Sequence, residues 1–251
     1  MKTNVNCPVC NRGCLFLDAV DFNKSCLETT GKYLPYLGIP VDYVICSNCG
    51  FCFSPEIATW KLDDFNKMIY NEQYVIVDPD YIETRPRANA ANLISMFGHH
   101  AKSIRHLDYG GGSGLLAKIL KDSKWESVSY DPLVDTDASI DQLGKFDLIT
   151  AFEVFEHVPD VQKLMENLRS LLSPNGIILF STLISDDDIQ INKKLSWWYA
   201  SPRNGHISLF SRKSLTILAQ NYGLKLFSFS AGFHAFFSSV PPWADQFISL
   251  T

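Results

Sequence analysis

The sequence has 251 residues, a formal net charge of −5, 46% hydrophobic residues and 20% charged residues. This composition supplies a sizeable apolar core and excludes a wholly disordered chain. The negative charge argues against a protein that coats nucleic acid through its overall field. No apolar run is long enough to span a membrane, and the N-terminal residues carry no apolar signal segment. We therefore expect a soluble, cytoplasmic protein without a membrane partner.

All seven cysteines lie in the first 52 residues, which marks this part of the chain as a separate module. Four of them form two Cys-x-x-Cys pairs, Cys7 with Cys10 and Cys46 with Cys49, and 35 residues separate the pairs. Two such pairs are the ligand arrangement of a four-thiolate zinc site, which is closed and leaves no position for water. The pattern predicts a structural zinc ion in a small ribbon of short strands.

The other three cysteines leave the identity of the four zinc ligands undecided. The gap between the pairs is longer than in common zinc ribbons, so Cys14, Cys26 or Cys52 could replace one of the four ligands. Buried free thiols, or redox chemistry by one Cys-x-x-Cys pair, are the other interpretations. A disulfide framework is disfavoured because the cysteine count is odd and the expected compartment is reducing.

The segment after the cysteines has the apolar spacing of helices. Residues 60–74 predict one helix, and residues 88–97 predict a second. An aromatic and charged connector between them contains Tyr81 and Arg85. This segment therefore separates the cysteine module from the rest of the chain.

A glycine-rich turn follows the next predicted strand. That strand, at residues 103–108, ends in Asp108 and runs into the sequence Gly-Gly-Gly-Ser-Gly at residues 110–114, after which a helix is expected. Glycine lets the backbone approach a ligand, and the start of a helix presents unpaired N–H groups. The dinucleotide fingerprint fails because Leu115 stands where its third glycine should be, and no phosphate-binding G-x-x-x-x-G-K loop is present. The acid at the strand end favours a ligand with a cationic centre and an amino group.

Three further strands alternate with helices, at residues 127–130, 146–151 and 177–181. The first of these ends at Asp131, 17 residues after the glycine turn, where an acid is placed to accept hydrogen bonds from ribose hydroxyls. Alternating strands and helices indicate a parallel sheet that binds its ligand over the carboxyl ends of the strands.

These motifs together resemble class I S-adenosylmethionine-dependent methyltransferases. The resemblance covers residues 85–230 and rests on four motifs in order, which are the Leu-Asp-Tyr-Gly-Gly-Gly-Ser-Gly run at 107–114, Asp131, the Glu-Val-Phe-Glu-His run at 153–157 and the Leu-Ser-Pro-Asn-Gly-Ile run at 172–177. It implies a Rossmann-like α/β fold with a seven-stranded sheet, whose last two strands, at 224–230 and 233–237, pair antiparallel.

The expected organisation has three consecutive segments. A zinc-ribbon-like module occupies residues 1–55, a helical connector or lid occupies 56–100, and an S-adenosylmethionine-binding methyltransferase domain occupies 101–251. Cysteine-paired modules before such a domain resemble two arrangements. One is a set of sugar C-methyltransferases, which are longer than this chain; the other is a set of ribosomal RNA base methyltransferases, whose basic excess is absent here.

The resemblance also implies the residues of a cofactor site. The glycines at 110, 112 and 114 would pack against the methionine part of the cofactor, Asp131 would hold its ribose, and residues 135–140 would reach its adenine. Arg85 would pair with the carboxylate of the cofactor, or would only pack the connector. The candidate cofactor-binding residues are Tyr81, Arg85, Asp108, Gly110, Gly112, Gly114, Asp131, Phe152 and Glu153.

Two histidines are the candidate catalytic residues. Methyl transfer is an in-line displacement that depends mainly on positioning, with a base only where the acceptor loses a proton. His157 follows a strand, and His206 lies in an aromatic insertion that commonly lines the acceptor pocket in such folds; each could instead cap a helix or fix a loop. The insertion also contains Trp197, Trp198 and Arg203, which would suit a planar or sugar-like acceptor with an anionic group.

We therefore expect a methyltransferase that acts on a small metabolite, with a sugar or a nucleotide-linked sugar as the first candidate and no nucleic-acid partner. Two alternatives stay open. One is an RNA base methyltransferase that uses the zinc module to bind its substrate. The other is a non-catalytic module that binds the cofactor or a partner protein.

Overall fold

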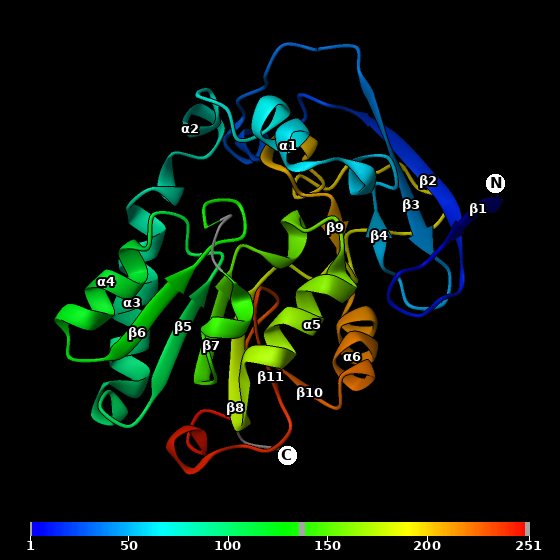
Figure 1. Cartoon of the computed structure of the whole chain (residues 1–251). Helices are drawn as coiled ribbons and strands as arrows, with labels where there is room; N and C mark the ends of the chain where they lie inside the picture. Colours follow the sequence, from blue (N-terminus) through cyan, green and yellow to red (C-terminus); the bar gives the residue numbers. More distant parts are fainter. Residues whose placement is uncertain (1, 136–138, 249–251) are drawn as a thin grey trace. The chain divides into compact units, whose positions relative to one another are not determined.

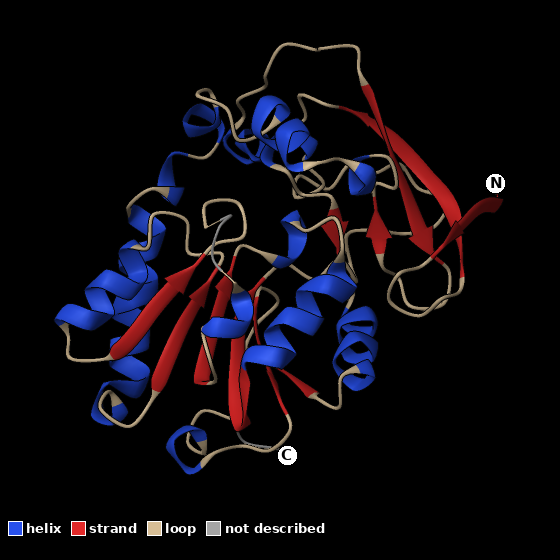
Figure 2. Cartoon of the chain, viewed as in Figure 1, coloured by secondary structure: helices blue, strands red, loops and turns tan. Residues whose placement is uncertain are grey.

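The computed structural model describes residues 2–135 and 139–248 of the chain (Figures 1 and 2). They form two compact units, each built from several stretches of sequence. Unit 1 comprises Met1–Pro79, Phe155–Gln162 and Thr182–Leu218, and unit 2 comprises Asp80–Val154, Lys163–Ser181 and Ala219–Thr251. This grouping does not follow the three consecutive segments expected from the sequence, because two later segments belong with the N-terminal part. As functional segments, the three stay a prediction.

Unit 2 is built around a six-stranded mixed sheet with strand order β10-β11-β8-β7-β5-β6. Its strands are β5 (Arg105–Tyr109), β6 (Glu126–Tyr130), β7 (Phe146–Phe152), β8 (Leu172–Ser181), β10 (Lys225–Ser228) and β11 (Phe233–Phe237). Strands β6, β5, β7 and β8 are parallel, whereas β11 is antiparallel to both β8 and β10. The α/β fold and the antiparallel final pair are thus confirmed. The described residues contribute six strands to this sheet, where the resemblance implied seven.

Two helices, α3 (Thr84–Phe97) and α4 (Leu115–Asp122), supply part of the apolar core of unit 2. Leu93 of α3 and Leu116 of α4 lie in one apolar cluster with Leu148 of β7 and Leu179 of β8. The central strands are therefore buried, which explains the continuous apolar run at residues 177–180 of β8. The helices from this point of the chain onward are α3 (Thr84–Phe97), α4 (Leu115–Asp122), α5 (Val161–Leu171) and α6 (Arg212–Asn221).

Unit 1 contains a five-stranded sheet with strand order β1-β2-β3-β4-β9, in which all neighbours are antiparallel. Its strands are β1 (Lys2–Asn6), β2 (Gly13–Asp21), β3 (Pro40–Cys46), β4 (Cys52–Phe53) and β9 (Ser208–Leu209). The first four flank the cysteine pairs, and of these β2, β3 and β4 agree with the ribbon predicted from the sequence, whereas β1 was not predicted. The fifth comes from the insertion after β8, where Leu209 pairs with Cys52. The insertion therefore completes the sheet of the cysteine module.

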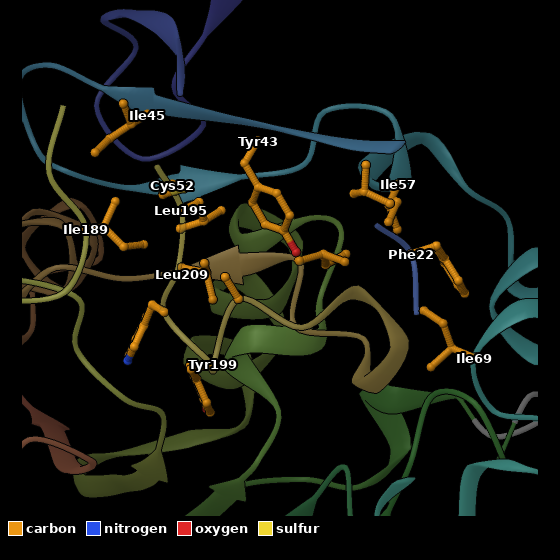
Figure 3. Close-up of a cluster of buried hydrophobic side chains, with 14 of the residues drawn as sticks. Phe22, Tyr43, Ile45, Cys52, Ile57, Ile69, Ile189, Leu195, Tyr199 and Leu209 are labelled. Carbon is orange, nitrogen blue, oxygen red and sulfur yellow. The ribbon is translucent and has the colours of Figure 1, made fainter. Parts of the chain in front are cut away.

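One apolar core joins the N-terminal strands to the insertion within unit 1 (Figure 3). Tyr43 of β3 packs in this core with Leu195 and Tyr199 of the insertion. Trp197 is 6% exposed and belongs to the same core, whereas Trp198 is 36% exposed. Most of the aromatic character of the insertion therefore serves packing.

The single helix expected over residues 60–74 is divided into α1 (Leu62–Met68) and α2 (Tyr74–Val77). Asn71 lies in the break, where its side-chain amide donates to the Lys67 carbonyl (2.9 Å) and its side-chain oxygen accepts from the Gln73 N–H (3.1 Å). An asparagine that bonds to nearby backbone in this way competes with the helix. The apolar spacing still predicts which residues are buried, since apolar side chains of this segment lie together in the core of unit 1.

Short 3-10 turns make up the remaining helical structure. They are η1 (Cys26–Thr30), η2 (Ile57–Thr59), η3 (Pro79–Tyr81), η4 (Gly98–His100), η5 (Ile140–Gln142), η6 (Phe155–His157), η7 (Pro202–Asn204) and η8 (Pro242–Ala244). Across the described residues, none of the helices combines the length and the apolar character that a membrane crossing needs.

Candidate functional site

The glycine loop of unit 2 connects the carboxyl end of β5 to the start of α4. Gly110, Gly112 and Gly114 have φ values of 73°, 53° and 73°, in the left-handed region that other residues adopt only with strain. At Gly110 a Cβ would lie 2.5 Å from a methyl group of Val154, whereas at Gly112 it would meet no protein atom within 4 Å. The loop is thus packed on one side and open on the other, as a backbone that receives a ligand requires.

Asp131 ties this loop to the end of β6. One carboxylate oxygen accepts the N–H of Gly112 (2.9 Å), and the other accepts the N–H of Leu133 (2.8 Å). A carboxylate offers about four acceptor positions, so two such bonds leave capacity for ribose hydroxyls. Of the stretch expected near adenine, residues 136–138 lie outside the described residues.

Asp108 lies beneath the loop and is 4% exposed. The Thr150 hydroxyl donates to its Oδ1 (2.8 Å). Burial raises the pKa of Asp108 to about 7, because an ionised carboxylate loses its hydration there. A Cβ at Gly111 would overlap Ser129 Oγ and would lie 2.5 Å from Asp108 Oδ2, so the loop needs glycine at this position as well.

A buried hydrogen-bonded chain behind Asp108 escaped the sequence analysis. His106 Nδ1 lies 2.8 Å from Ser127 Oγ, and its Nε2 lies 3.0 Å from Thr150 Oγ1. While Asp108 is ionised, the Thr150 proton points to it, so His106 Nε2 donates to Thr150 and Nδ1 accepts from Ser127. Burial lowers the pKa of His106 to about 3 and keeps the ring neutral. Alternation along β5 could have signalled that His106 and Asp108 share a face.

Glu153 follows the end of β7 with a φ of 54°, which is a strained value for a residue with a side chain. Ser181 Oγ donates to Glu153 Oε1 (2.7 Å), and the Arg85 guanidinium lies 3.2 Å from Glu153 Oε2. Arg85 is thus aimed at the end of β7, and its pairing with the carboxylate of the cofactor stays a prediction. Phe152 packs near Phe233, with ring centroids 6.2 Å apart.

Tyr81 precedes these residues in the chain. It ends the 3-10 turn η3 before α3, and 46% of its surface is exposed. It lies in unit 2 three residues before the start of α3. Its role at the cofactor stays a prediction.

The four predicted cysteine ligands converge in unit 1. Cys7 Sγ lies 3.5 Å from Cys49 Sγ, Cys10 Sγ lies 3.4 Å from Cys46 Sγ, and all four sulfurs are within 4.8 Å of one another. Four sulfurs at about 2.3 Å around a tetrahedral zinc ion would be about 3.8 Å apart, so the cluster fits zinc. The adjacent Cys7 sulfur and burial raise the pKa of Cys49, so a cation is needed to hold this group as a thiolate.

The other three cysteines are outside this cluster. Cys14 is buried opposite Cys46 on the paired strands β2 and β3, and Cys52 belongs to the apolar core of unit 1. Cys26 Sγ lies 3.8 Å from His206 Nδ1. The geometry therefore favours the set of Cys7, Cys10, Cys46 and Cys49 over the substitutions that the sequence left open.

The two histidines predicted as bases lie side by side in unit 1. Their ring centroids are 4.9 Å apart with an interplanar angle of 73°. Glu156, which the sequence analysis did not single out, joins them: ligand atoms of Glu156, His157 and His206 all lie within 4.8 Å of one another. We call these three residues the Glu-His-His cluster. Arg203, by contrast, is 5% exposed and donates to the Ile69 carbonyl (3.0 Å), so it is occupied inside unit 1.

Comparison with known proteins gives a family match over more than half of the chain. The model of a family described as a methyltransferase domain matches residues 81–228. The ubiquinone biosynthesis O-methyltransferase of Azorhizobium caulinodans is 32% identical over 119 residues, covering 36% of this chain and 47% of that protein. The protein of the same name from Histophilus somni is 32% identical over 107 residues, covering 41% of this chain and 34% of that protein. The match thus spans less than half the length of these two relatives.

Among solved structures, an O-methyltransferase family protein from Burkholderia thailandensis is similar with a TM-score of 0.50 and 13% sequence identity. The similarity covers 71% of this chain and 63% of that one. At this level of identity the likeness concerns the fold, and it agrees with the parallel core and antiparallel final pair of the unit 2 sheet.

Proposed function

Because the chain belongs to the methyltransferase domain family, we propose that it transfers the methyl group of S-adenosylmethionine to a small-molecule acceptor. The observation that carries this proposal is the glycine loop after β5, whose Gly112 N–H is held by Asp131 at the end of β6. The two parallel strands end at the same edge, and the loop is open on one side. This is the place where open α/β sheets bind their ligands.

Within unit 2, the glycine loop, Asp131, Asp108 and Arg85 have proposed roles that their positions support. The glycine backbone would contact the methionine part, and Asp131 would accept the ribose hydroxyls. Asp108, in its ionised form, would favour the ammonium and sulfonium charges of the cofactor through space. Arg85, now paired with Glu153, would exchange this partner for the cofactor carboxylate. When bound, the cofactor supplies an electrophilic methyl group, and these residues only bind and orient it.

For the acceptor, we propose a hydroxyl group on a small molecule. The names of the matched relatives describe O-methyltransferases, which favours oxygen as the acceptor atom. A sugar or a nucleotide-linked sugar stays our first candidate, and a phenol-type hydroxyl is the second. Because the Arg203 guanidinium makes hydrogen bonds within unit 1, we do not propose it as the residue that binds an anionic group of the acceptor. Loss of the acceptor proton is assigned to the Glu-His-His cluster, which contains both predicted bases.

For the cysteine cluster, we propose a structural zinc ion bound by Cys7, Cys10, Cys46 and Cys49. The convergence of the four sulfurs supports this assignment. The reducing cytoplasm that we expect for this protein supports it too, because it keeps cysteine thiols reduced. Cys46→Ser should release the zinc, which metal analysis of the purified protein would detect. Retention of one zinc per chain in this variant would contradict the ligand set.

Thermal unfolding of the full chain tests the cofactor assignment. S-adenosylhomocysteine at 100 times its dissociation constant should add about 2.7 kcal/mol of stability, a rise in Tm of roughly 5–11 °C for a protein of this size. NAD should give no shift. Asp131→Ala should weaken binding of the compound by about 1–3 kcal/mol, the cost of a lost hydrogen bond to a charged group. Absence of any shift with S-adenosylhomocysteine would overturn the proposal.

A further inference from the structure

The Glu-His-His cluster of unit 1 brings three metal-binding side chains together inside the protein. Glu156 is 0% exposed and His206 is 5% exposed, and the cluster lies apart from the four cysteines. Glu156 and His157 belong to the 3-10 turn η6, and His206 comes from the loop before β9. Residues 50 positions apart in the sequence thus converge on one point. A buried carboxylate between two imidazoles needs a compensating charge or hydrogen bonds.

Tyr199 orients two members of the cluster at once. Its hydroxyl donates to Glu156 Oε1 (2.5 Å), and its backbone carbonyl lies 2.8 Å from His206 Nδ1. A carbonyl oxygen only accepts, so Nδ1 of His206 carries a proton, and in the neutral ring Nε2 keeps its lone pair. Metal-binding histidines show this arrangement, in which the second ring nitrogen donates to a carbonyl and fixes the tautomer. The Tyr199 side chain itself is held in the apolar core drawn in Figure 3.

Gly205 lets the backbone approach His157. Its φ is +86°, and a Cβ at this position would lie 2.9 Å from His157 Nδ1 and 3.3 Å from the Tyr70 hydroxyl. The residue beside His206 therefore has no side chain, and this brings the His206 segment against His157. The local backbone is built around the close approach of the two imidazoles.

We propose that Glu156, His157 and His206 bind a divalent transition-metal ion, in a second metal site separate from the four cysteines. Two imidazoles and one carboxylate suit Zn²⁺, which takes nitrogen and oxygen ligands at about 2.0–2.2 Å. Three protein ligands leave a position for water or for an acceptor oxygen, unlike a closed four-thiolate site. The ion would add a positive charge beside the buried carboxylate, which also accepts the Tyr199 hydroxyl.

The consequence for chemistry rests on the proposed function, whereas metal binding itself does not. A hydroxyl bound to such an ion loses its proton near neutral pH, and the proton passes to solvent. The cluster thus promotes deprotonation through the ion, and the imidazoles serve as ligands.

Metal stoichiometry of the full-length protein tests the second site. After loading with Zn²⁺ and removal of the excess, elemental analysis should find two zinc ions per chain in the unchanged protein. His206→Asn and Glu156→Gln should each lower this number to one. His99→Asn, which replaces an exposed histidine outside the cluster, should keep two.

Cobalt substitution separates loss of the site from failure to fold. Co²⁺ bound by thiolates gives intense sulfur-to-metal charge-transfer absorption, whereas Co²⁺ bound by nitrogen and oxygen does not. The His206→Asn variant should keep the full thiolate absorption and bind one equivalent of Co²⁺ instead of two. This result would show that unit 1 remains folded around its cysteines.

Three results would overturn the second metal site. The first is that the unchanged protein binds only one equivalent of metal, and the second is that the His206→Asn variant retains two. The third is methyl transfer that depends on His157 and His206 in protein with one metal ion per chain, which would make the imidazoles direct bases. Binding of S-adenosylhomocysteine by the same samples tests the proposed function independently. A single metal ion with a normal shift in Tm refutes only the metal site, and two ions without a shift refute only the methyltransferase proposal.

Discussion

The buried carboxyl of Asp108 should make the stability of the ligand-free protein fall with rising pH. Its pKa is raised from 3.8 to about 7 by burial, so the folded state binds a proton there over a pH range in which the unfolded state has lost it. For such a group the stabilisation is complete below the unfolded pKa and is lost as the pH rises through the folded pKa. One pKa unit corresponds to about 1.36 kcal/mol. Raising the pH from 5 to 8 should therefore lower the free energy of unfolding by about 3 kcal/mol through this carboxyl.

Asp108→Asn isolates this contribution. The amide oxygen can still accept the Thr150 hydroxyl, and the side chain stays neutral at every pH in the range. Urea unfolding followed by circular dichroism at pH 5, 6, 7 and 8 gives the free energy of unfolding of both proteins. Between pH 5 and pH 8, the free energy of unfolding of the variant should rise by about 3 kcal/mol relative to that of the unchanged protein.

Asp21→Asn is the matched control. Slight burial would raise the pKa of Asp21, but hydrogen bonds from the N–H groups of Leu37, Asn23 and Gly38 lower it overall. A lowered carboxyl pKa gives stability that is lost only as the pH falls through that pKa, so this control difference should be constant from pH 5 to pH 8. Parallel pH profiles for the Asp108→Asn variant and the unchanged protein would refute the reasoning for Asp108.

Three further predictions concern packing. Gly111→Ala should lower the affinity for S-adenosylhomocysteine at least about tenfold, measured by calorimetry, because the added Cβ would overlap Asp108. Gly13→Ala is the control: a Cβ there meets nothing within 4 Å, so the affinity should stay unchanged. Trp197→Ala should lower the free energy of unfolding by about 3–5 kcal/mol in urea, whereas Trp198→Ala, at a half-exposed position, should change it much less. Cys52→Ser should destabilise the protein by about 1–3 kcal/mol, since it buries a hydroxyl in an apolar core, without changing the zinc content; a lost zinc ion would show that Cys52 is a ligand.

The local structure of the candidate cofactor site in unit 2 was largely predictable because its elements follow one another in the sequence. Strand β5, the glycine loop and α4 are consecutive, and Asp131 ends the next strand. Such local motifs fix both the conformation and the edge of the sheet at which they lie. The hydrogen-bonded chain through His106 and Thr150 was missed because it depends on the register of β5 against β7, which residue spacing does not give.

The Glu-His-His cluster of unit 1 was predictable only in its residue types. His157 and His206 were selected as titratable groups after strands, but their approach and the contribution of Glu156 required the tertiary structure. The insertion was expected to line a pocket, and its composition did not reveal that two residues of it extend the N-terminal sheet. A strand of two residues carries too little periodicity to be recognised in sequence.

The proposed structural zinc also has a mechanical connection to the Glu-His-His cluster within unit 1. Five residues after His157, the Gln162 amide donates to the Pro8 carbonyl (2.9 Å), between the first pair of cysteines. Five residues after His206, the Ser211 hydroxyl donates to the carbonyl of Cys49 in the second pair. Each histidine segment is therefore fixed to one of the two cysteine turns, whose backbone conformation a bound zinc ion would hold. A zinc module can in this way set the spacing of the two imidazoles without contacting any substrate, which explains why the cysteine turns and the insertion share one unit.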